Sequence, residues 1–488
     1  MTTDLSAFIA SVPKAQQPLT MLSCKGREIV NAHGEKVNLR GANIGAWMNM
    51  EYYLHGFFGT ERQMRAMALD LLGEEKGKFI FDSMINHFFT EKDVAYLKGL
   101  GTTVLRITLN ARHFEREDRP FRYLEEGFAR IDRALEWCEA YGMYAILDLH
   151  AVFGYQNGAW ISDNSTGEAG FWRNEHYLER FVRLWEEFAR RYKDRTVVAG
   201  YDLMNEPSTK DRYGRIPMPL PWDAQALNRT YRKAVEAIRK IDSRHIIFLE
   251  GDDYAERFLC LDAPFAENLA YSSHNYSFKA ISAPFYPGTD REGTYWNKEQ
   301  LRKEFYEKEA TQFCQRYNVP LWIGEFGSRN YTQLMDDQIA VFEEFGAHWT
   351  MWQHKDVGYS SLLRYRHDCA YLQKFNDILD RFGTMYGGIH GRAETQARSR
   401  MREQCRQFED ALVEATQSPW VGKGDAYLLP RWIDDCYYAK ILCYEYLKRF
   451  ETMTLEEIDQ MFESSFSIEN CMEHPLAQAV KHYCRQET

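Results

Sequence analysis

Residues 144–150 read YAILDLH, and residues 198–206 read VAGYDLMNE. Both runs are largely apolar, and neither alternates strictly with polar residues, a pattern typical of strands buried on both faces. Between them lie a polar loop and a stretch, Leu178–Tyr192, in which apolar residues recur at intervals of three and four as in an amphipathic helix. This strand–loop–helix unit recurs along the chain, and its recurrence predicts the fold.

The same kind of run occurs eight times, with helical patterns such as Leu124–Tyr141 in between. The predicted strands are Leu39–Ile44, Thr103–Thr108, Tyr144–His150, Val198–Glu206, Ile246–Gly251, Leu269–Tyr276, Leu321–Gly327 and His348–Gln353. Buried strands that alternate with helices predict an α/β fold, a (β/α)8 TIM barrel. We assign residues 1–384 to this barrel domain and residues 385–488 to a helical C-terminal extension.

The extension is predicted to pack on the barrel or on a partner subunit. Four residues share one helical face, and Thr454 with Glu457 makes a capping box before another helix; the four are Met401, Cys405, Phe408 and Leu412. A second apolar set is expected to be buried, either on the barrel, which is the ordinary case, or in a homo-oligomer interface. Its members are Trp432, Cys436, Tyr437, Ile441, Cys443 and Tyr444.

Composition narrows the class of protein. The 488 residues include 60 basic and 71 acidic side chains, a net charge of -11, which argues against a nucleic-acid partner. The 45% apolar and 27% charged residues are typical of a globular protein. Aromatic residues reach 15%, a content that suits a protein stacking flat ligand faces.

The cellular location is predicted from the lack of a membrane-spanning segment and of a secretory signal in the sequence. No apolar run approaches the roughly 20 residues that span a bilayer, so no membrane partner is expected. The first residues, MTTDLSAFIASVPK, lack the basic start and apolar stretch of a secretory signal. The 10 cysteines are scattered without C-x-x-C pairs, as expected of reduced thiols. These features predict a cytoplasmic protein.

Polar and aromatic residues stand where the predicted strands end. In a TIM barrel the C-terminal strand ends carry the catalytic groups, and buried polar groups are costly unless they meet in one site. Taken singly, each residue has a structural explanation, and His150 alone would be read as a hydrogen-bonded core histidine. Taken together, they predict a site. The set is Arg106, His150, Asn205, Glu206, His274, Tyr276, Glu325, Trp349 and Trp352.

Two glutamates give this site its chemistry. Glu206 and Glu325 end the fourth and seventh predicted strands and are 119 positions apart. Closure of the barrel would bring them to facing sides of one mouth, where glycoside hydrolysis requires a pair of carboxyl groups. Alone, Glu325 would be explained as a helix N-cap partner and Glu206 as part of a surface turn before Pro207.

The motifs together resemble glycoside hydrolase family 5, a retaining family of the clan A barrels. The resemblance covers residues 35–380 and not the extension. It rests on LRGANIG, RIT, LDLH, GYDLMNEP, SHNY, WIGEFG and WTMWQ, which occur in the family's order. NEP after a strand together with a later GEFG is the specific part.

The resemblance implies a role for each matching residue. Glu206 matches the acid/base, Glu325 the nucleophile, and Asn205 the residue that contacts the sugar 2-hydroxyl. Trp352 matches the aromatic platform beneath the sugar, with Trp349 as its competitor. Four further residues match those that surround and support the substrate site in the family. They are Arg106, His150, His274 and Tyr276.

Elementary electrostatics agrees with these roles. Arg106 beside Glu325 would keep the nucleophile ionised, and Tyr276 would donate a hydrogen bond to the same carboxylate. Glu206 must start protonated, and the nearby Glu325 anion would raise its pKa. No metal or organic cofactor is expected, since the sequence has neither an H-x-H nor an H-E-x-x-H motif.

The loop after His150 is a second candidate for sugar binding. Its amides, carboxylate and indole suit hydrogen bonding and stacking; a solvated loop with a turn at Asn157–Gly158 is the alternative. The residues are Gln156, Asn157, Trp160 and Asp163. Together with the long aromatic segment 45–90, this loop would block one end of the cleft and make the enzyme exo-acting.

The sequence thus predicts a cytoplasmic retaining β-glycosidase acting on small β-linked oligosaccharides, with a β-mannoside or β-glucoside as glycone. An endo-β-1,4-glucanase is the alternative within the class. From other classes, a non-catalytic carbohydrate-binding barrel and a structural role centred on the extension stay open, although binding alone needs no pair of glutamates.

Overall fold

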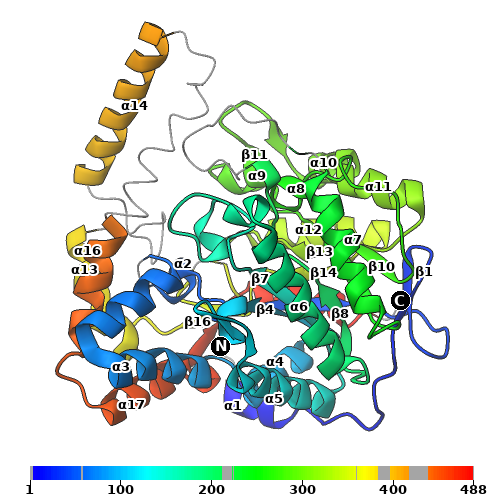
Figure 1. Cartoon of the computed structure of the whole chain (residues 1–488), viewed down its shortest axis with the longest axis horizontal. Helices are drawn as coiled ribbons and strands as arrows, with labels where there is room; N and C mark the ends of the chain where they lie inside the picture. The colour runs from blue at the N-terminus through cyan, green and yellow to red at the C-terminus, as the bar shows by residue number, and fades with distance from the viewer. Residues whose placement is uncertain are drawn as a thin grey trace.

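Eight parallel strands close into a barrel at the centre of the molecule (Figure 1). The computed structural model describes residues 4–56, 59–210, 223, 225–358, 360–382, 396–416 and 438–486. Around the barrel the strand order is β10-β13-β14-β3-β4-β7-β8-β9. Every predicted strand is confirmed: β3 Arg40–Met48, β4 Val104–Asn110, β7 Tyr144–Ala151, β8 Val198–Asp202, β9 Ile246–Glu250, β10 Leu269–His274, β13 Leu321–Glu325 and β14 His348–Met351.

Helices surround the strands and bury one face each. In α6 the side chains of Leu178, Phe181, Trp185 and Phe188 are buried, which is the three-and-four spacing expected from the sequence. The helices that follow or join the strands are α4 Glu91–Leu100, α5 Glu125–Tyr141, α6 Glu175–Tyr192, α7 Ala226–Arg239, α8 Asp252–Ala255, α9 Phe278–Ser282, α10 Lys298–Glu307, α11 Glu309–Tyr317 and α12 Thr332–Phe345. None of the described helices is long and apolar enough to cross a membrane.

The interior of the barrel is apolar toward the N-terminal ends of the strands and charged toward their C-terminal ends. Val104, Ile146, Phe248 and Trp322 belong to one buried cluster, which the hairpin of β1 Ser23–Lys25 and β2 Glu28–Val30 covers. Side chains on a strand alternate in direction, so the residue two positions on points into the barrel again. Those residues are charged: Arg106 after Val104, Asp148 after Ile146 and Glu250 after Phe248.

The second strand is longer than predicted. The predicted strand was Thr103–Thr108, with Arg106 taken to be near its end. The observed strand β4 continues to Asn110. Arg106 is therefore in the middle of its strand, fully buried, with its guanidinium 5.8 Å from the ring of Trp322. It lies one layer below the mouth of the barrel.

Two long connections cover the C-terminal side of the first and third strands. After β3 the chain forms α2 Tyr52–His55 and α3 Glu61–Phe88, so the aromatic segment 45–90 is largely helical. After β7 comes the Gly- and Asn-rich loop, with short 3-10 turns at Trp160–Ser162 and Gly170–Arg173. Other short pairs of strands join later loops: β5 Glu115–Arg116 with β6 Arg119–Tyr123, and β11 Gly288–Thr289 with β12 Tyr295–Trp296.

The C-terminal extension packs on the barrel's own helices. Figure 1 shows α16 and α17 beside α3, and α18 lies against α4 and α12. On α17, Asp459 accepts hydrogen bonds from Ser83 (2.6 Å) and His87 (2.9 Å) of α3. Its helices are α14 Gln396–Thr416, α16 Ala439–Leu447, α17 Leu455–Phe466 and α18 Leu476–Cys484. The helix α13 Ala370–Phe382, which precedes residue 385, packs against α16 and α17, and α1 Leu5–Ala10 lies near α4.

Some details of the extension differ from expectation. It is not wholly helical, because β17 (Cys471–Glu473) pairs antiparallel with β16 (Leu363–Tyr365), which pairs with β15 (Lys355–Asp356). The capping box of Thr454 and Glu457 is confirmed. Cys443 is buried as expected, whereas Ile441 and Tyr444 are exposed.

The remaining predictions for the extension have mixed outcomes. The helix carrying Met401 and Cys405 forms, with Phe408 and Leu412 exposed on it. Trp432, Cys436 and Tyr437 lie outside the described residues, as does the domain boundary at 384. The homo-oligomer and the cytoplasmic location stay predictions.

A buried lysine of the barrel domain forms an ion pair and also contacts the extension. The ammonium of Lys355 lies 2.7 Å from Asp93 and donates to the carbonyl of Phe466 at 2.9 Å. Burial alone would raise the pKa of Asp93, but the charge of Lys355 and the hydrogen bond from His354 lower this pKa to about 2. Both partners of the pair are almost completely buried.

We expect Lys355→Met to lower the free energy of unfolding by about 3–5 kcal/mol, because it leaves the Asp93 carboxylate buried without its cation. Urea unfolding followed by circular dichroism measures this loss. As a control, Lys240→Met removes an exposed ion pair with Glu236 and is expected to cost at most about 1 kcal/mol. Equal losses in the two variants would contradict a supporting role for the buried pair.

Candidate active site

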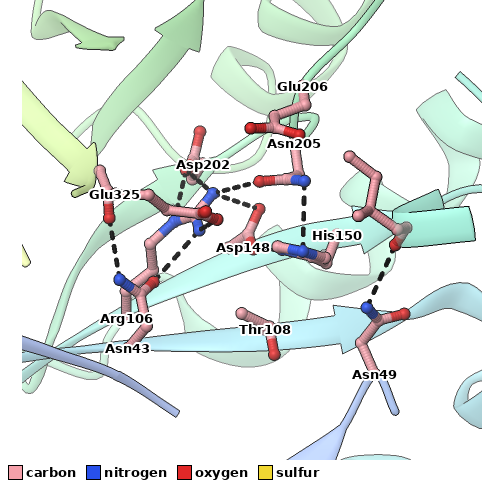
Figure 2. A network of polar contacts seen from close by, with 12 residues as sticks. Asn43, Asn49, Arg106, Thr108, Asp148, His150, Asp202, Asn205, Glu206 and Glu325 are labelled. Carbon is pink, nitrogen blue, oxygen red and sulfur yellow. Dashed lines mark hydrogen bonds and ion pairs between the residues drawn. The ribbon is translucent and has the colours of Figure 1, made fainter. Parts of the chain in front are cut away.

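The guanidinium of Arg106 is the centre of a network of polar side chains (Figure 2). It has no exposed surface, and all of its nitrogens are engaged. The partners come from different strands and their ends: Glu325 (2.7 Å), Asn205 (2.9 Å), Glu250 (3.0 Å), Asp202 (3.0 Å), Asp148 (3.2 Å) and Asn43 (3.2 Å). Arg106 thus acts on substrate through its neighbours and not by contact.

Glu325 is held in its ionised form. Arg106 donates to one carboxylate oxygen at 2.7 Å, and the Tyr276 hydroxyl donates to the other at 2.7 Å. Burial on its own would raise the pKa of Glu325, but the positive charges of His274 and Arg106 outweigh it and bring the pKa below its ordinary value. Arg106 and Tyr276 thus make the contacts with Glu325 that the sequence predicted.

The pKa of Glu206 is shifted in the opposite direction. Its backbone N–H donates to Glu250 at 2.7 Å, which fixes a residue whose φ of 45° lies in the left-handed region. Burial raises the pKa of the Glu206 carboxyl, the Glu325 and Glu250 anions add to this rise, and His274, 2.6 Å away, opposes it. The net effect is a raised pKa.

The two carboxyl groups face each other at short range. Oxygens of Glu206 and Glu325 lie within 4.8 Å of each other and of a nitrogen of His274. A separation of about 5–5.5 Å between the carboxyl groups is the spacing of retaining glycosidases, whereas inverting enzymes need roughly 6.5–9.5 Å. A proton donor and an anion at this distance can serve acid catalysis and nucleophilic attack on one sugar.

The same three side chains have the spacing of a metal site, but both nitrogens of His274 already face carboxyl groups. They lie 2.6 Å from Glu206 and 3.3 Å from Glu250. The neighbouring acidic groups raise the pKa of His274 well above its usual range, although burial opposes this.

A cavity of about 180 Å³ opens above the two glutamates. Its lining residues are Glu51, Tyr53, His150, Trp160, Ile161, Glu206, Tyr276, Phe278, Ile281, Glu325, Gly327, Arg329, Trp352 and Ser360. Apolar walls with a few convergent polar groups are typical of ligand sites. Of the predicted site residues, His150, Trp160, Tyr276 and Trp352 reach this cavity beside the two glutamates.

The structure decides between the two tryptophans. Trp352 lines the cavity, stacks on His150 with ring centres 5.4 Å apart, and donates its indole N–H to Tyr53 at 2.7 Å. Trp349 is completely buried and donates to Glu343 of α12 at 2.8 Å, so it faces the helices. Trp352 is therefore the aromatic wall of the cavity.

Three residues of the loop after β7 that were predicted to bind sugar form hydrogen bonds within the protein instead. Gln156 is fully buried and donates to the carbonyls of His150 (2.7 Å) and Asn205 (2.9 Å). Asn157 is also fully buried and donates to the Glu206 carbonyl at 2.8 Å. Their amides hold the backbone of the strand ends and do not line the cavity, contrary to our prediction.

Asp163 was also predicted to bind sugar, but it does not line the cavity, whereas Trp160 does. The Asp163 carboxylate accepts hydrogen bonds from the backbone of Arg62 (2.7 Å) and from Arg112 (3.0 Å), which ties the loop to the start of α3. The Trp160 ring packs on Tyr52 (4.7 Å) and Tyr53 (5.2 Å). The loop and the aromatic segment after β3 therefore meet over one side of the cavity.

Glu51 is a site residue that sequence reasoning missed. It lines the cavity and lies 3.1 Å from the imidazole of His150, whose other nitrogen is 2.7 Å from Asp148. Burial raises the pKa of Glu51 to about 7, against the opposing effect of His150. A single acidic residue in the otherwise uncharged run WMNMEYY was the available signal.

The family model described as Cellulase (glycosyl hydrolase family 5) matches residues 30–358. The chain belongs to glycosyl hydrolase family 5. Members of this family cleave glycosidic bonds with retention of configuration, as the spacing of Glu206 and Glu325 suggests.

Relatives within family 5 differ in how much of the chain they match. A protein named Beta-xylosidase from Phanerodontia chrysosporium is 31% identical over 93% of this chain and 96% of its own length. Endoglucanase C from Acetivibrio thermocellus is 25% identical over 56% of this chain and 85% of its own. A solved structure titled as that of a glycoside hydrolase, at 24% identity and a TM-score of 0.50, covers 66% of this chain and 90% of that one and shows the fold.

Replacement of Gln156 separates its structural task from sugar binding. We expect Gln156→Ala to lower the free energy of unfolding by about 2–3 kcal/mol, because two buried carbonyls lose their donor. Urea unfolding measures this, and Gln312→Ala, at an exposed glutamine, is expected to stay within about 0.5 kcal/mol of the parent. An unchanged stability of Gln156→Ala would restore the sugar-binding interpretation.

Proposed function

We propose that this family 5 enzyme is an exo-acting β-glycosidase that removes one terminal sugar from short β-linked substrates. The packing of Trp160 on Tyr52 and Tyr53 supports the proposal, since Trp160 and Tyr53 line the cavity together with His150 and Trp352. In the proposed binding mode these rings stand where a further unit on the non-reducing side of the bound sugar would lie.

The two glutamates divide the chemistry of this reaction. An oxygen of Glu325 attacks the anomeric carbon while Glu206 gives its proton to the departing glycosidic oxygen, which leaves a covalent glycosyl ester on Glu325. Esterification removes the negative charge of Glu325, so the pKa of Glu206 falls and its carboxylate can take a proton from water. That water attacks the same carbon, releases Glu325 and returns the β-anomer.

The glycone is proposed from similarity and chemistry together. The match to the relative named Beta-xylosidase extends over nearly the full length of both chains, including the extension, which makes xylose the first candidate. Glucose and mannose are the comparators that the motifs suggested. Glu51 and His150 offer this sugar a carboxyl and an imidazole side by side at the closed end of the cavity.

An endo-acting glucanase is the weaker candidate. The endoglucanase relatives match 56% of this chain, a share too small to include both the barrel and the extension. An endo enzyme needs a cleft open at both ends, and the aromatic contact between Trp160 and Tyr53 obstructs one of them.

Hydrolysis of short substrates tests the exo mode. We expect xylo-oligosaccharides to shorten by one sugar at a time, and one of the nitrophenyl β-glycosides of xylose, glucose, mannose and galactose to be preferred. Glu325→Gln, assayed in parallel, is expected to lose activity by at least about 10⁴-fold, as removal of a nucleophile does elsewhere. A rapid fall in the viscosity of a long soluble xylan, glucan or mannan would contradict the exo mode.

The pH profile tests the assignment of the acid. We expect kcat/KM to decline with rising pH only above the ordinary glutamate range, because the pKa of Glu206 is raised. Glu206→Gln should abolish this alkaline decline and retain most of kcat/KM toward a dinitrophenyl glycoside, whose leaving group needs no proton, whereas kcat should fall because the second step loses its base. Glu51→Gln is the control, because burial raises the Glu51 pKa to about 7; loss of the decline in this variant alone would reassign the acid.

A further inference from the structure

The segment after β10 forms an apolar wall at the outer edge of the cavity. Phe278 lines the cavity with 68% of its surface exposed, and Ile281 lines it one turn later on α9. The Phe278 ring stacks on Tyr276, with centres 5.4 Å apart and planes 19° apart. One face of Phe278 is thus supported by a residue of the site, and the ring presents a large exposed apolar surface.

This wall has a firm base. Ile281 is buried in a small apolar cluster with Tyr286, Trp296, Leu301 and Leu334. The Tyr276 hydroxyl is anchored on Glu325. A single exposed ring is ordinary in itself, but this one lies in the lining of the cavity beside a second apolar side chain, Ile281.

The departing group of the substrate faces this wall. Glu206 protonates the leaving oxygen, so the leaving group lies on the Glu206 side of the cleaved bond. The end of β10 reaches Glu206 directly: its last residue, His274, lies 2.6 Å from the Glu206 carboxyl, and Tyr276 and Phe278 follow His274 in the chain. The closed end of the cavity is built instead after β3, β7 and β14, from Tyr53, Trp160 and Trp352.

The chemistry of the wall favours an apolar leaving group. Phe278 and Ile281 carry no hydrogen-bonding atoms, and the hydroxyl of Tyr276 is already engaged by Glu325. A second sugar laid on this wall would lose water from its hydroxyls without new partners there, which is costly, whereas an aryl or alkyl group would not. Arg329 borders the cavity from the loop after β13 and is itself exposed, so a neutral ligand leaves it in solvent.

We propose that Phe278 and Ile281 form a binding site for an apolar aglycone, an aryl ring or an alkyl chain. The enzyme then acts best on β-glycosides of apolar alcohols, with a single sugar as the glycone. This inference rests on the β-glycosidase function proposed above and names the other half of its substrate.

A series of alkyl β-glycosides tests the site. The glycone is the sugar preferred in the nitrophenyl panel, and the alcohols are ethanol, butanol, hexanol and octanol, whose leaving-group reactivity is nearly constant. We expect kcat/KM to rise at least about tenfold from ethyl to octyl, because each methylene buried on the wall adds binding. In Phe278→Ala this rise should shrink to about threefold or less.

Two further variants make the test specific. Phe285→Ala is the matched control, because Phe285 follows α9, is 64% exposed and does not line the cavity; its alkyl series should equal that of the parent. Phe278→Leu keeps an apolar side chain and should restore most of the rise. Since Phe278 is exposed, thermal unfolding of all three variants should match the parent.

The outcomes separate this inference from the glycosidase function. Alkyl glycosides hydrolysed in a Glu325-dependent way, but without any effect of chain length, would overturn the aglycone site and leave the glycosidase function standing. A disaccharide with the same glycone that is tenfold better than the octyl glycoside would do the same. Absence of Glu325-dependent hydrolysis of every glycoside would overturn both.

Discussion

The buried guanidinium of Arg106 is the constraint on which the active site depends. A full charge without exposed surface is tolerated only among anions and hydrogen-bond acceptors. The acidic layer of the barrel, Asp148, Asp202 and Glu250, supplies them together with Glu325. Glu250 in turn holds the backbone of Glu206, so one cation sets both the position of the acid and the ionisation of its partner.

A helix that follows the barrel strands supports the same site from behind. Tyr371 of α13 donates to the carbonyl of His55, the last residue of α2, at 2.8 Å. The helix α2 carries Tyr53, and Glu51 stands at its N-cap, so this side of the cavity rests on α13, which itself packs on α16 and α17. This dependence agrees with the full-length similarity to the relative named Beta-xylosidase, whereas the endoglucanase relatives match about half of the chain.

The sequence predicted the barrel because burial on both faces leaves a visible apolar run, and it predicted Glu206 and Glu325 because each ends such a run. It also held a signal that we did not use: Asp148, Asp202 and Glu250 are isolated acids within apolar strands. The tasks of Gln156 and Asn157 were not predictable, since an amide in a loop binds sugar or backbone according to neighbours from other strands. The strand β17 was hidden for the same reason, because its partner β16 is about 100 residues earlier.

The ionisation of Glu325 is measured most directly by inactivation with a 2-deoxy-2-fluoro dinitrophenyl β-glycoside. Its leaving group needs no proton, so the rate of inactivation against pH reports the nucleophile alone. We predict a rate that stays constant down to pH values below the ordinary glutamate pKa, with the label on Glu325 in the peptide map. A rate that falls already above that pKa, or a label on another carboxylate, would contradict the control of Glu325 by Arg106.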